Sequence, residues 1–150
     1  MKKSLLSAII LLSLSLLIIG CAAQTKLADY QPKSAEEKQV LETMVRFQES
    51  QKERDLAEYM ACFHNNATIK YNQDGIEKPI LSKQQFEDRL KAGYWGDMET
   101  DMVNPKITIV GNDATVRCYH YVEGYGISHS INLIKESEKW SIIKWGWKEN

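Results

Sequence analysis

The chain has 150 residues, and its 19 basic and 20 acidic side chains give a formal net charge of −1 at pH 7. A near-neutral chain without a basic cluster argues against nucleic acid or an anionic membrane surface as the partner. The sequence also has no glycine-rich phosphate loop, no serine–histidine–aspartate order and no paired-carboxylate spacing. Function must therefore be argued from the fold and from a few individual side chains.

The first residues are typical of an export signal. A basic start precedes an apolar run over residues 5–19, which is too short to span a membrane. The tetrad Ile18-Ile19-Gly20-Cys21 resembles the bacterial lipoprotein signal box, in which the cysteine is lipidated and becomes the first residue of the mature protein. Because Ala22 is not the aspartate that retains such proteins in the inner membrane, the resemblance implies a lipid anchor in the outer membrane, on its periplasmic face. The alternative is an ordinary signal peptide with a chance cysteine.

Removal of the predicted signal, residues 1–20, leaves 130 residues, which is enough for one domain and too few for two. Its two lysines leave with it, so the formal charge becomes about −3. Residues 21–34 contain the lipidated cysteine and a stretch without periodicity that includes Pro32. We expect this stretch to be a flexible tether spanning on the order of 20 Å. Residues 35–150 then form the domain.

Helical patterns open the domain. Ser34 with Glu37 three residues later is a capping-box signature, and apolar residues follow at helical spacing to about Arg54. Asp55 with Glu58 repeats the signature and opens a second, short helix. The sequence therefore predicts one long helix followed at once by a short one.

Alternating segments and one further helix fill the rest of the domain. Ser82 with Gln85 caps the third helix, and Pro79 limits the segment before it to the edge of a sheet. The expected strands are residues 67–72, 76–80, a stretch within 98–110, the two arms of a hairpin over 114–133, and 140–147. This order predicts an α+β fold in which helices cover one face of a curved antiparallel sheet.

The hairpin carries the candidate site. A two-residue turn at Gly124-Tyr125, with glycine first, places His120 opposite His129 and Cys118 opposite Ile131. Side chains alternate along a strand, so both imidazoles then lie on one otherwise apolar face, with their Cβ atoms about 5 Å apart. A slip of one residue would break this segregation, which supports the assignment of the face.

Two interpretations of this histidine pair remain open. The two imidazoles could share a metal ion with Cys118, or act as acid and base. Alternatively they are hydrogen-bonded residues near the end of a hairpin, which we favour because their spacing matches no known metal motif. We therefore predict no metal site and no cofactor.

Two cysteines remain besides Cys21. In an oxidising compartment Cys62 and Cys118 could form a disulfide. Cys62 lies on a predicted helix and Cys118 on the inner face of a strand, so we favour two separate buried thiols.

Three segments carry a family resemblance: RFQESQKERDLAEYMACFHNNATIKYN from Arg46, GNDATVRCYH from Gly111 and EKWSIIKWGW from Glu138. Together they resemble the nuclear transport factor 2-like superfamily, most nearly its SnoaL-like branch, over roughly residues 35 to 148. The resemblance implies a cone in which the curved sheet wraps the long N-terminal helix and encloses an apolar pocket.

Function does not follow from this fold, because the superfamily contains isomerases, cyclases and dehydratases as well as noncatalytic binding modules. The ketosteroid isomerases among them need a carboxylate base, a tyrosine and a protonated acid. In this chain Tyr71 falls at the position of the base, Phe47 at that of the tyrosine and Ile131 at about that of the acid. This substitution of all three groups argues against isomerase chemistry of that type.

We therefore expect a noncatalytic domain that binds a small apolar ligand or a protein partner. The expected pocket is lined by Phe47, Tyr71, His120, His129, Ile131 and Trp145. One alternative is an isomerase, cyclase or hydratase of the SnoaL-like type that uses His120, His129 or Tyr71 as acid and base. Another is an envelope module that forms a homodimer through the outer sheet face bearing Tyr119 and Tyr121. The aromatic residues could also be plain core.

Overall fold

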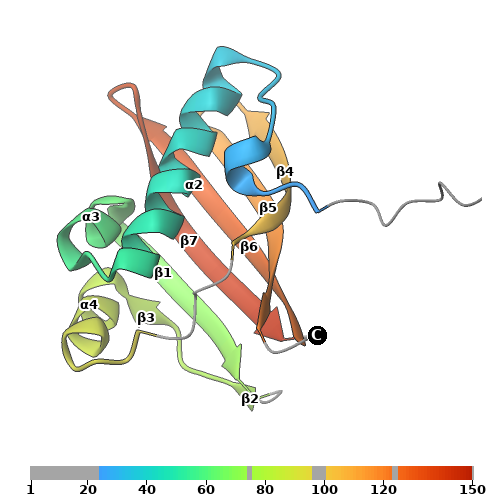
Figure 1. Ribbon diagram of the computed structural model, residues 1–150. Helices are drawn as coiled ribbons and strands as arrows, with labels where there is room; N and C mark the ends of the chain where they lie inside the picture. The colour runs from blue at the N-terminus through green and yellow to red at the C-terminus, as the bar shows by residue number, and fades with distance from the viewer. Residues whose placement is uncertain (1–23, 74–75, 96–100, 123–124, 150) are drawn as a thin grey trace, which may run out of the picture.

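The computed structural model describes residues 24–73, 76–95, 101–122 and 125–149. The predicted signal peptide and the predicted lipidation site at Cys21 lie outside these ranges. The described elements are η2 (Leu27–Asp29), α2 (Ala35–Glu53), α3 (Leu56–Ala61), β1 (Phe63–Gln73), β2 (Ile76–Glu77), β3 (Leu81–Ser82), α4 (Lys83–Lys91), β4 (Val103–Val110), β5 (Asp113–Val122), β6 (Tyr125–Glu136) and β7 (Lys139–Glu149). The helices lie against one face of a curved sheet, with α2 running across it (Figure 1). The predicted α+β class is confirmed.

The helix boundaries follow the local capping chemistry. The Ser34 hydroxyl accepts the backbone N–H of Glu37 at 3.0 Å, and α2 ends at Glu53, followed by the C-cap residue Arg54 with a left-handed φ of 55°. Asp55 then accepts the N–H of Glu58 at 3.0 Å and starts α3. Side-chain caps satisfy backbone donors that would otherwise lack partners at a helix start, so a short motif is enough to position each one.

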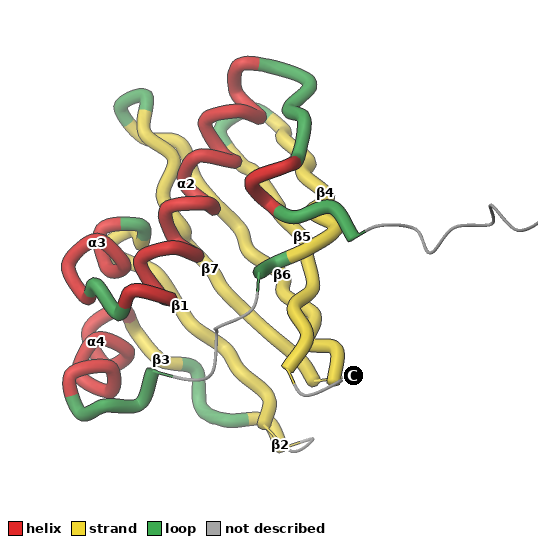
Figure 2. The backbone as a smooth tube through the Cα atoms, in the orientation of Figure 1, coloured by secondary structure: helices red, strands yellow, loops and turns green. Residues whose placement is uncertain are grey.

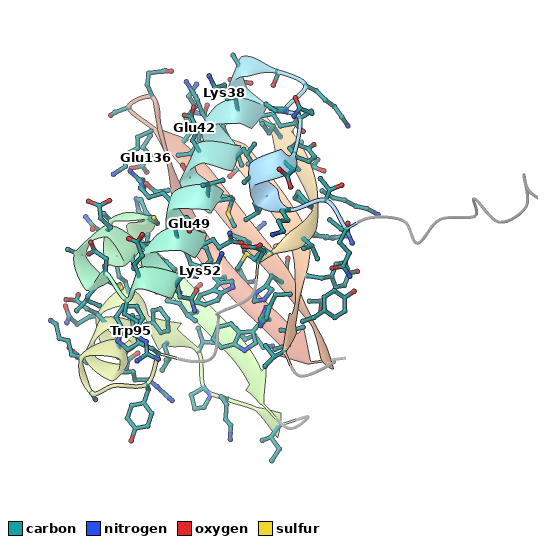
Figure 3. The ribbon with its side chains drawn as sticks, in the orientation of Figure 1. Lys38, Glu42, Glu49, Lys52, Trp95 and Glu136 are labelled. Atoms are coloured by element: carbon teal, nitrogen blue, oxygen red, sulfur yellow. The ribbon has the colours of Figure 1, made fainter. Side chains whose placement is uncertain are left out.

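The long helix α2 separates two kinds of side chain. Its charged side faces away from the sheet, and Lys38, Glu42 and Glu49 on that side are exposed (Figure 3). Its apolar side packs into the core, where Val40, Met44 and Phe47 are fully buried. Spacing of three and four residues places these side chains on one face, as expected for a helix that covers a sheet. No described helix has the length and apolarity needed to cross a bilayer.

The segment expected to be a flexible tether is partly docked onto the domain. Leu27 is fully buried, and its backbone N–H donates to the carbonyl oxygen of Met102 at 3.1 Å. The N–H of Asn104 donates to the carbonyl oxygen of Thr25 at 2.7 Å. Residues from Thr25 onward therefore belong to the folded unit. The sequence did not indicate this, because a single buried leucine produces no periodicity.

The sheet has the order β2-β1-β7-β6-β5-β4, with β3 pairing to β1. Neighbouring strands are antiparallel except for β1 and β7, which pair in parallel. The sheet is therefore mixed, where an antiparallel one was expected. A parallel pair needs a long connection, and here the whole chain between the two strands provides it. Figure 2 shows that the helices gather on the same face of this sheet.

The turn of the β5–β6 hairpin lies one residue earlier than predicted. Val122 pairs with Tyr125, whereas the predicted turn consisted of Gly124 and Tyr125. The two residues between the paired ones lie outside the described residues. Turn position depends on local backbone dihedral angles, and the glycine-first rule selected the wrong pair of residues.

This shift changes every cross-strand partner by two residues. His129 lies opposite Cys118, and His120 lies opposite Ile127, so the two histidines are diagonal neighbours and not a directly opposed pair. Side chains alternate with a period of two, and a shift of two residues therefore keeps each one on its predicted face.

Candidate functional site

Both imidazoles lie on the inner face of the hairpin, among apolar side chains. Along β5 buried and exposed residues alternate, and His120 is 3% exposed. On β6 His129 is also 3% exposed, and Ile131 is fully buried beside it. The predicted orientation of this face is confirmed. Buried imidazoles in apolar surroundings need hydrogen-bond partners, because unpaired polar groups are costly to bury.

The partners form a chain of three rings. The indole Nε1–H of Trp145, on β7, donates to Nδ1 of His129 at 3.1 Å. The other nitrogen of that ring, Nε2, lies 2.5 Å from Nδ1 of His120. The two imidazoles stack with centroids 4.7 Å apart, and the planes of His129 and Trp145 differ by 18°. We call these three side chains the inner hydrogen-bond chain.

The imidazoles of this chain are neutral at neutral pH. Burial lowers the pKa of His120 below its ordinary value. Burial, and then the proximity of His120, lower the pKa of His129 to about 3. A neutral imidazole has one donor nitrogen and one acceptor nitrogen, so the hydrogen bonds of the chain determine which nitrogen carries each proton.

A buried thiol, that of Cys118, lies on the same face as the inner hydrogen-bond chain. The thiol of Cys118 lies 3.6 Å from the sulfur of Met102, and burial raises the pKa of Cys118 to about 12. Cys62 is also a free, buried thiol. Within the described ranges, no three His, Cys, Asp or Glu side chains are grouped so that they could hold a metal ion. The local chemistry is that of neutral, apolar and sulfur-containing surfaces.

The structure brings most of the other predicted pocket residues to this region. Phe47 reaches it from α2 and meets Trp145 edge-on, with ring centroids 5.1 Å apart. Ile131 pairs with Trp145 across β6 and β7. The side chain of Tyr71 lies outside the described residues, and its backbone pairs with Trp147 in the parallel ladder.

Sequence reasoning missed several neighbours of Trp145. Phe86 of α4 and Phe63 of β1 lie with their ring centroids 5.7 and 6.2 Å from that of Trp145. No sequence signal indicates which ring of a distant strand each of them meets, because such contacts depend on strand order.

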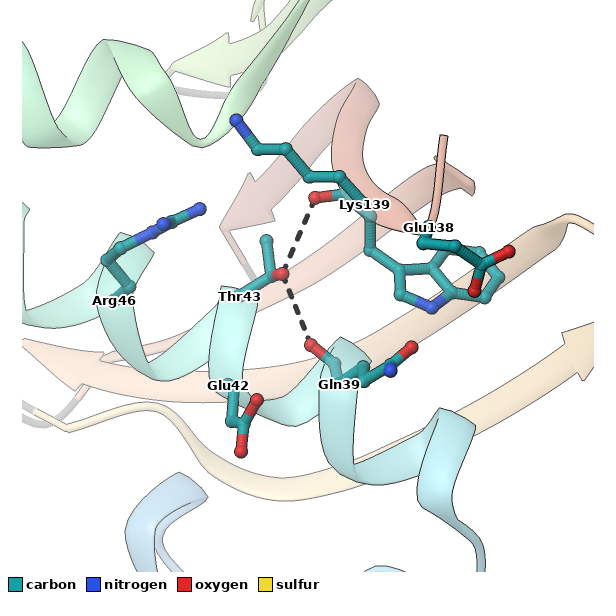
Figure 4. Close-up of a pocket in the computed structure, with 7 residues that line it drawn as sticks. Gln39, Glu42, Thr43, Arg46, Glu138 and Lys139 are labelled. Atoms are coloured by element: carbon teal, nitrogen blue, oxygen red, sulfur yellow. Dashed lines mark hydrogen bonds between the residues drawn. The ribbon is translucent and has the colours of Figure 1, made fainter. Parts of the chain in front are cut away.

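A separate open groove lies at the opposite end of β6, between α2 and the start of β7 (Figure 4). Its volume is about 490 Å³, and its lining residues are Gln39, Glu42, Thr43, Arg46, Glu138, Lys139 and Trp140. The Thr43 hydroxyl lies 3.2 Å from the carbonyl oxygen of Gln39 and 3.5 Å from that of Trp140. Side chains of both charge signs line the groove, so it offers no consistent electrostatic preference. No sequence pattern had indicated this groove.

Comparison with known families identifies the domain. A family model described as "Putative lumazine-binding" matches residues 35–148. The chain belongs to this family. The match to the "Putative lumazine-binding" model runs from the first residue of α2 into β7, so it includes every strand of the sheet. A search of the curated proteins finds no match.

Solved structures show the same fold. A nuclear transport factor 2-like protein of unknown function from Shewanella baltica OS155 has a TM-score of 0.66 at 20% identity, over 81% of this chain and 98% of that one. A similar protein from Silicibacter pomeroyi DSS-3 has a TM-score of 0.64 at 13% identity, over 80% and 100% of the two chains. One from Cytophaga hutchinsonii ATCC 33406 has a TM-score of 0.62 at 8% identity, over 78% and 100%. These similarities confirm the predicted nuclear transport factor 2-like fold.

Proposed function

We propose that this protein is a periplasmic lipoprotein, anchored in the outer membrane, whose domain binds a small and largely apolar ligand on the concave side of its sheet without catalysing a reaction. The inner hydrogen-bond chain is the observation that carries the ligand-binding part. An all-apolar core would avoid the cost of burying two imidazoles. In natural proteins, polar groups that are buried despite this cost concentrate at functional sites, which supports a ligand at the position of the two imidazoles.

The family description supports a particular shape of ligand. Lumazine is a flat, fused heteroaromatic bicycle with two apolar faces and polar atoms at its edge. The site offers aromatic rings for the faces, including Phe47 and Trp145, and an imidazole for the edge. Binding sites of this kind combine mostly apolar walls with a few placed polar groups.

Several features favour binding over catalysis. Both ring nitrogens of His129 are engaged in hydrogen bonds, so this residue has no nitrogen left to exchange a proton with a substrate. Phe47 and Ile131, at the positions where the ketosteroid isomerases need a tyrosine and a protonated acid, are fully buried apolar residues. A general base or acid must reach the proton that it transfers, and of the two imidazoles only His120 has a ring nitrogen left for this.

The anchor part of the proposal rests on the sequence around Cys21. Because Thr25 is already docked on the domain, four residues would link it to the lipid. Four extended residues span at most about 14 Å, so the anchor would hold the domain close to the bilayer. Labelling of the full-length protein with radioactive palmitate, compared with its Cys21→Ser variant, tests this part. Label on the variant, or none on the parent, would contradict it.

Thermal shift with lumazine tests the binding part. A ligand that prefers the folded state raises the melting temperature of the protein. We expect lumazine, or another flat bicycle in a small panel, to raise it in the parent and much less in a His120→Phe variant. Lys144→Gln, at an exposed position on β7, is the control and should behave as the parent does. A turnover that depends on pH and disappears in the His120→Phe variant would instead support the enzyme alternative.

The outer face of β5 favours a second role as a contact between two copies of the chain. Tyr119 and Tyr121 point away from the imidazoles and remain 41% and 40% exposed. Tyrosine is enriched at protein interfaces. Sedimentation equilibrium of the parent and of a Tyr119→Lys/Tyr121→Lys variant tests this role. A parent that is monomeric at micromolar concentration would remove it.

A further inference from the structure

We infer that the ligand is an uncharged compound that accepts a hydrogen bond, through a ring carbonyl or an equivalent oxygen, from the Nε2–H group of His120. This inference rests on the proposed function and specifies the chemical class of its ligand. The inference rests on four properties of the inner hydrogen-bond chain. Its direction is fixed, one of its ends is free, no described charged group lies beside that end, and reversal of its direction is costly.

The direction of the chain is fixed at Trp145. An indole nitrogen can only donate a hydrogen bond, so Nδ1 of His129 must accept. A neutral imidazole that accepts at Nδ1 carries its proton on Nε2. The Nε2–H group of His129 therefore donates to Nδ1 of His120. By the same rule, His120 carries its own proton on Nε2.

The Nε2–H group of His120 is the free end of the inner hydrogen-bond chain. Within the described residues its ring forms hydrogen bonds only through Nδ1, to His129. Among the described residues, one fully buried side-chain nitrogen or oxygen lacks a hydrogen-bond partner, and this atom is Nε1 of Trp140. Nε2 of His120 does not belong to this class, and a ligand that reaches this end of the inner hydrogen-bond chain would meet a donor that has no partner among the described residues. Polarisation along consecutive hydrogen bonds strengthens such a terminal donor.

Within the described residues, no charged side chain contributes to the lowered pKa of His120, which burial alone accounts for. Glu37 is the one buried carboxylate of the described residues, and it accepts hydrogen bonds from the Tyr30 hydroxyl and the Lys33 backbone. Asp101, the nearest carboxylate to Met102 in the sequence, is paired with Lys26 and Lys52. An ion placed beside His120 would therefore be desolvated without a partner, which is strongly unfavourable.

The chain also discriminates against ligands that only donate hydrogen bonds. To accept a hydrogen bond at Nε2, His120 would have to move its proton to Nδ1. The new Nδ1–H group would then face the Nε2–H group of His129, and two donors cannot bond to each other. Reversal of His129 in turn would leave two donors facing each other at Trp145, because the indole cannot accept. A site built around one donor rejects compounds that lack the matching acceptor.

The experiment compares two rigid bicycles that differ by one carbonyl group, 1-indanone and indane, on the ¹⁵N-labelled full-length protein. We expect 1-indanone to bind at least about tenfold more tightly, as one hydrogen bond to a buried group implies. Long-range ¹H–¹⁵N spectra should show both buried imidazoles protonated on Nε2. A purely structural role for the chain predicts no preference between the two probes.

Two variants test the mechanism. His120→Phe should bind indane and lose the preference for 1-indanone, because the donor is gone while the ring volume is retained. Trp145→Phe should show mixed protonation of the imidazole nitrogens and a reduced preference. Lys144→Gln is the matched control on the same strand as Trp145.

The outcomes separate this inference from the proposed function. Equal binding of 1-indanone and indane, or protonation of His120 on Nδ1, overturns the inference and leaves ligand binding intact. Failure of both probes, together with a failure of lumazine and the flat bicycles of the thermal-shift panel, overturns both proposals. The comparison of probes on the parent protein does not depend on whether either variant folds.

Discussion

The indole of Trp145 donates its only hydrogen bond to Nδ1 of His129, across two neighbouring strands. This contact makes a core aromatic residue also a determinant of protonation, since it selects which nitrogen of the imidazole carries the proton. The packing of the core and the polarity of the candidate site are therefore linked through one bond of 3.1 Å.

Replacement of Trp145 by phenylalanine should destabilise the fold. The change removes a buried donor, leaves an imidazole nitrogen without a partner and creates a small void, so we expect a loss of about 2 to 4 kcal/mol in the free energy of unfolding. Urea denaturation followed by circular dichroism measures it. The exposed Lys144→Gln change should alter stability by less than about 0.5 kcal/mol. A loss for Trp145→Phe as small as that of the control would show that the hydrogen bond is absent in solution.

Stability should fall as the pH is lowered from about 6.5 toward 4. In the unfolded chain His129 has its ordinary pKa of 6.5, whereas in the folded protein burial lowers the pKa to about 3. Between these values the unfolded state binds more protons, so acid favours unfolding, by up to about 1.4 kcal/mol per pH unit for each such group. His120, whose pKa burial also lowers, adds to this effect.

Denaturation at pH 7.5, 6, 5 and 4.5 checks this prediction. A His129→Gln variant, which can still donate and accept hydrogen bonds, should show a shallower dependence on pH. Asp101, whose carboxyl pKa is held below 3.8 by hydrogen bonds from two lysines, acts only nearer pH 4 and below. If the parent and the variant lose stability equally over this window, the depressed pKa of His129 is refuted.

Leu27→Ala should destabilise the domain although Leu27 lies in the segment predicted to be a tether. A leucine that is fully buried in a core loses about 2 to 5 kcal/mol on truncation to alanine. Thermal unfolding of the full-length protein measures this loss, with Gln31→Ala at an exposed position of the same segment as control. Identical melting temperatures for the two variants would mean that the segment detaches in solution.

Ser82→Ala should cost about 1 kcal/mol, because it removes the N-cap of α4. The Ser82 hydroxyl and the Gln85 side chain each accept the other residue's backbone N–H, at 3.3 and 2.9 Å. A Ser82→Asp variant should retain most of the stability, since aspartate also caps a helix. Chemical denaturation of both variants gives the difference, and a loss for Ser82→Asp equal to that for Ser82→Ala would contradict a capping role.

The features that the sequence predicted well are those that local chemistry determines. Ser34, Asp55 and Ser82 position the starts of three helices through their own hydrogen bonds, and all three were found in advance. The inward face of the hairpin was also found, because alternation alone determines it. Its register was two residues off, since that depends on the turn.

The features that were missed join segments far apart in the chain. The parallel pairing of β1 with β7, the docking of Leu27 against Met102 and the bond between Trp145 and His129 depend on strand order and on tertiary packing. Periodicity in a single sequence contains no information on such pairings. The candidate site was accordingly assigned to the right face, and the hydrogen-bond chain that defines its polarity was not foreseen.

The position of β7 has a consequence for how the chain reaches its folded state. β7 lies between β1 and β6, so an early strand and a late strand of the sheet are joined only through the last one. A nascent polypeptide without β7 can pair β4, β5 and β6, but it cannot join them to β1, and its early helices have only part of a surface to pack on. Completion of the sheet must therefore wait until β7 has been synthesised and can pair with both β1 and β6.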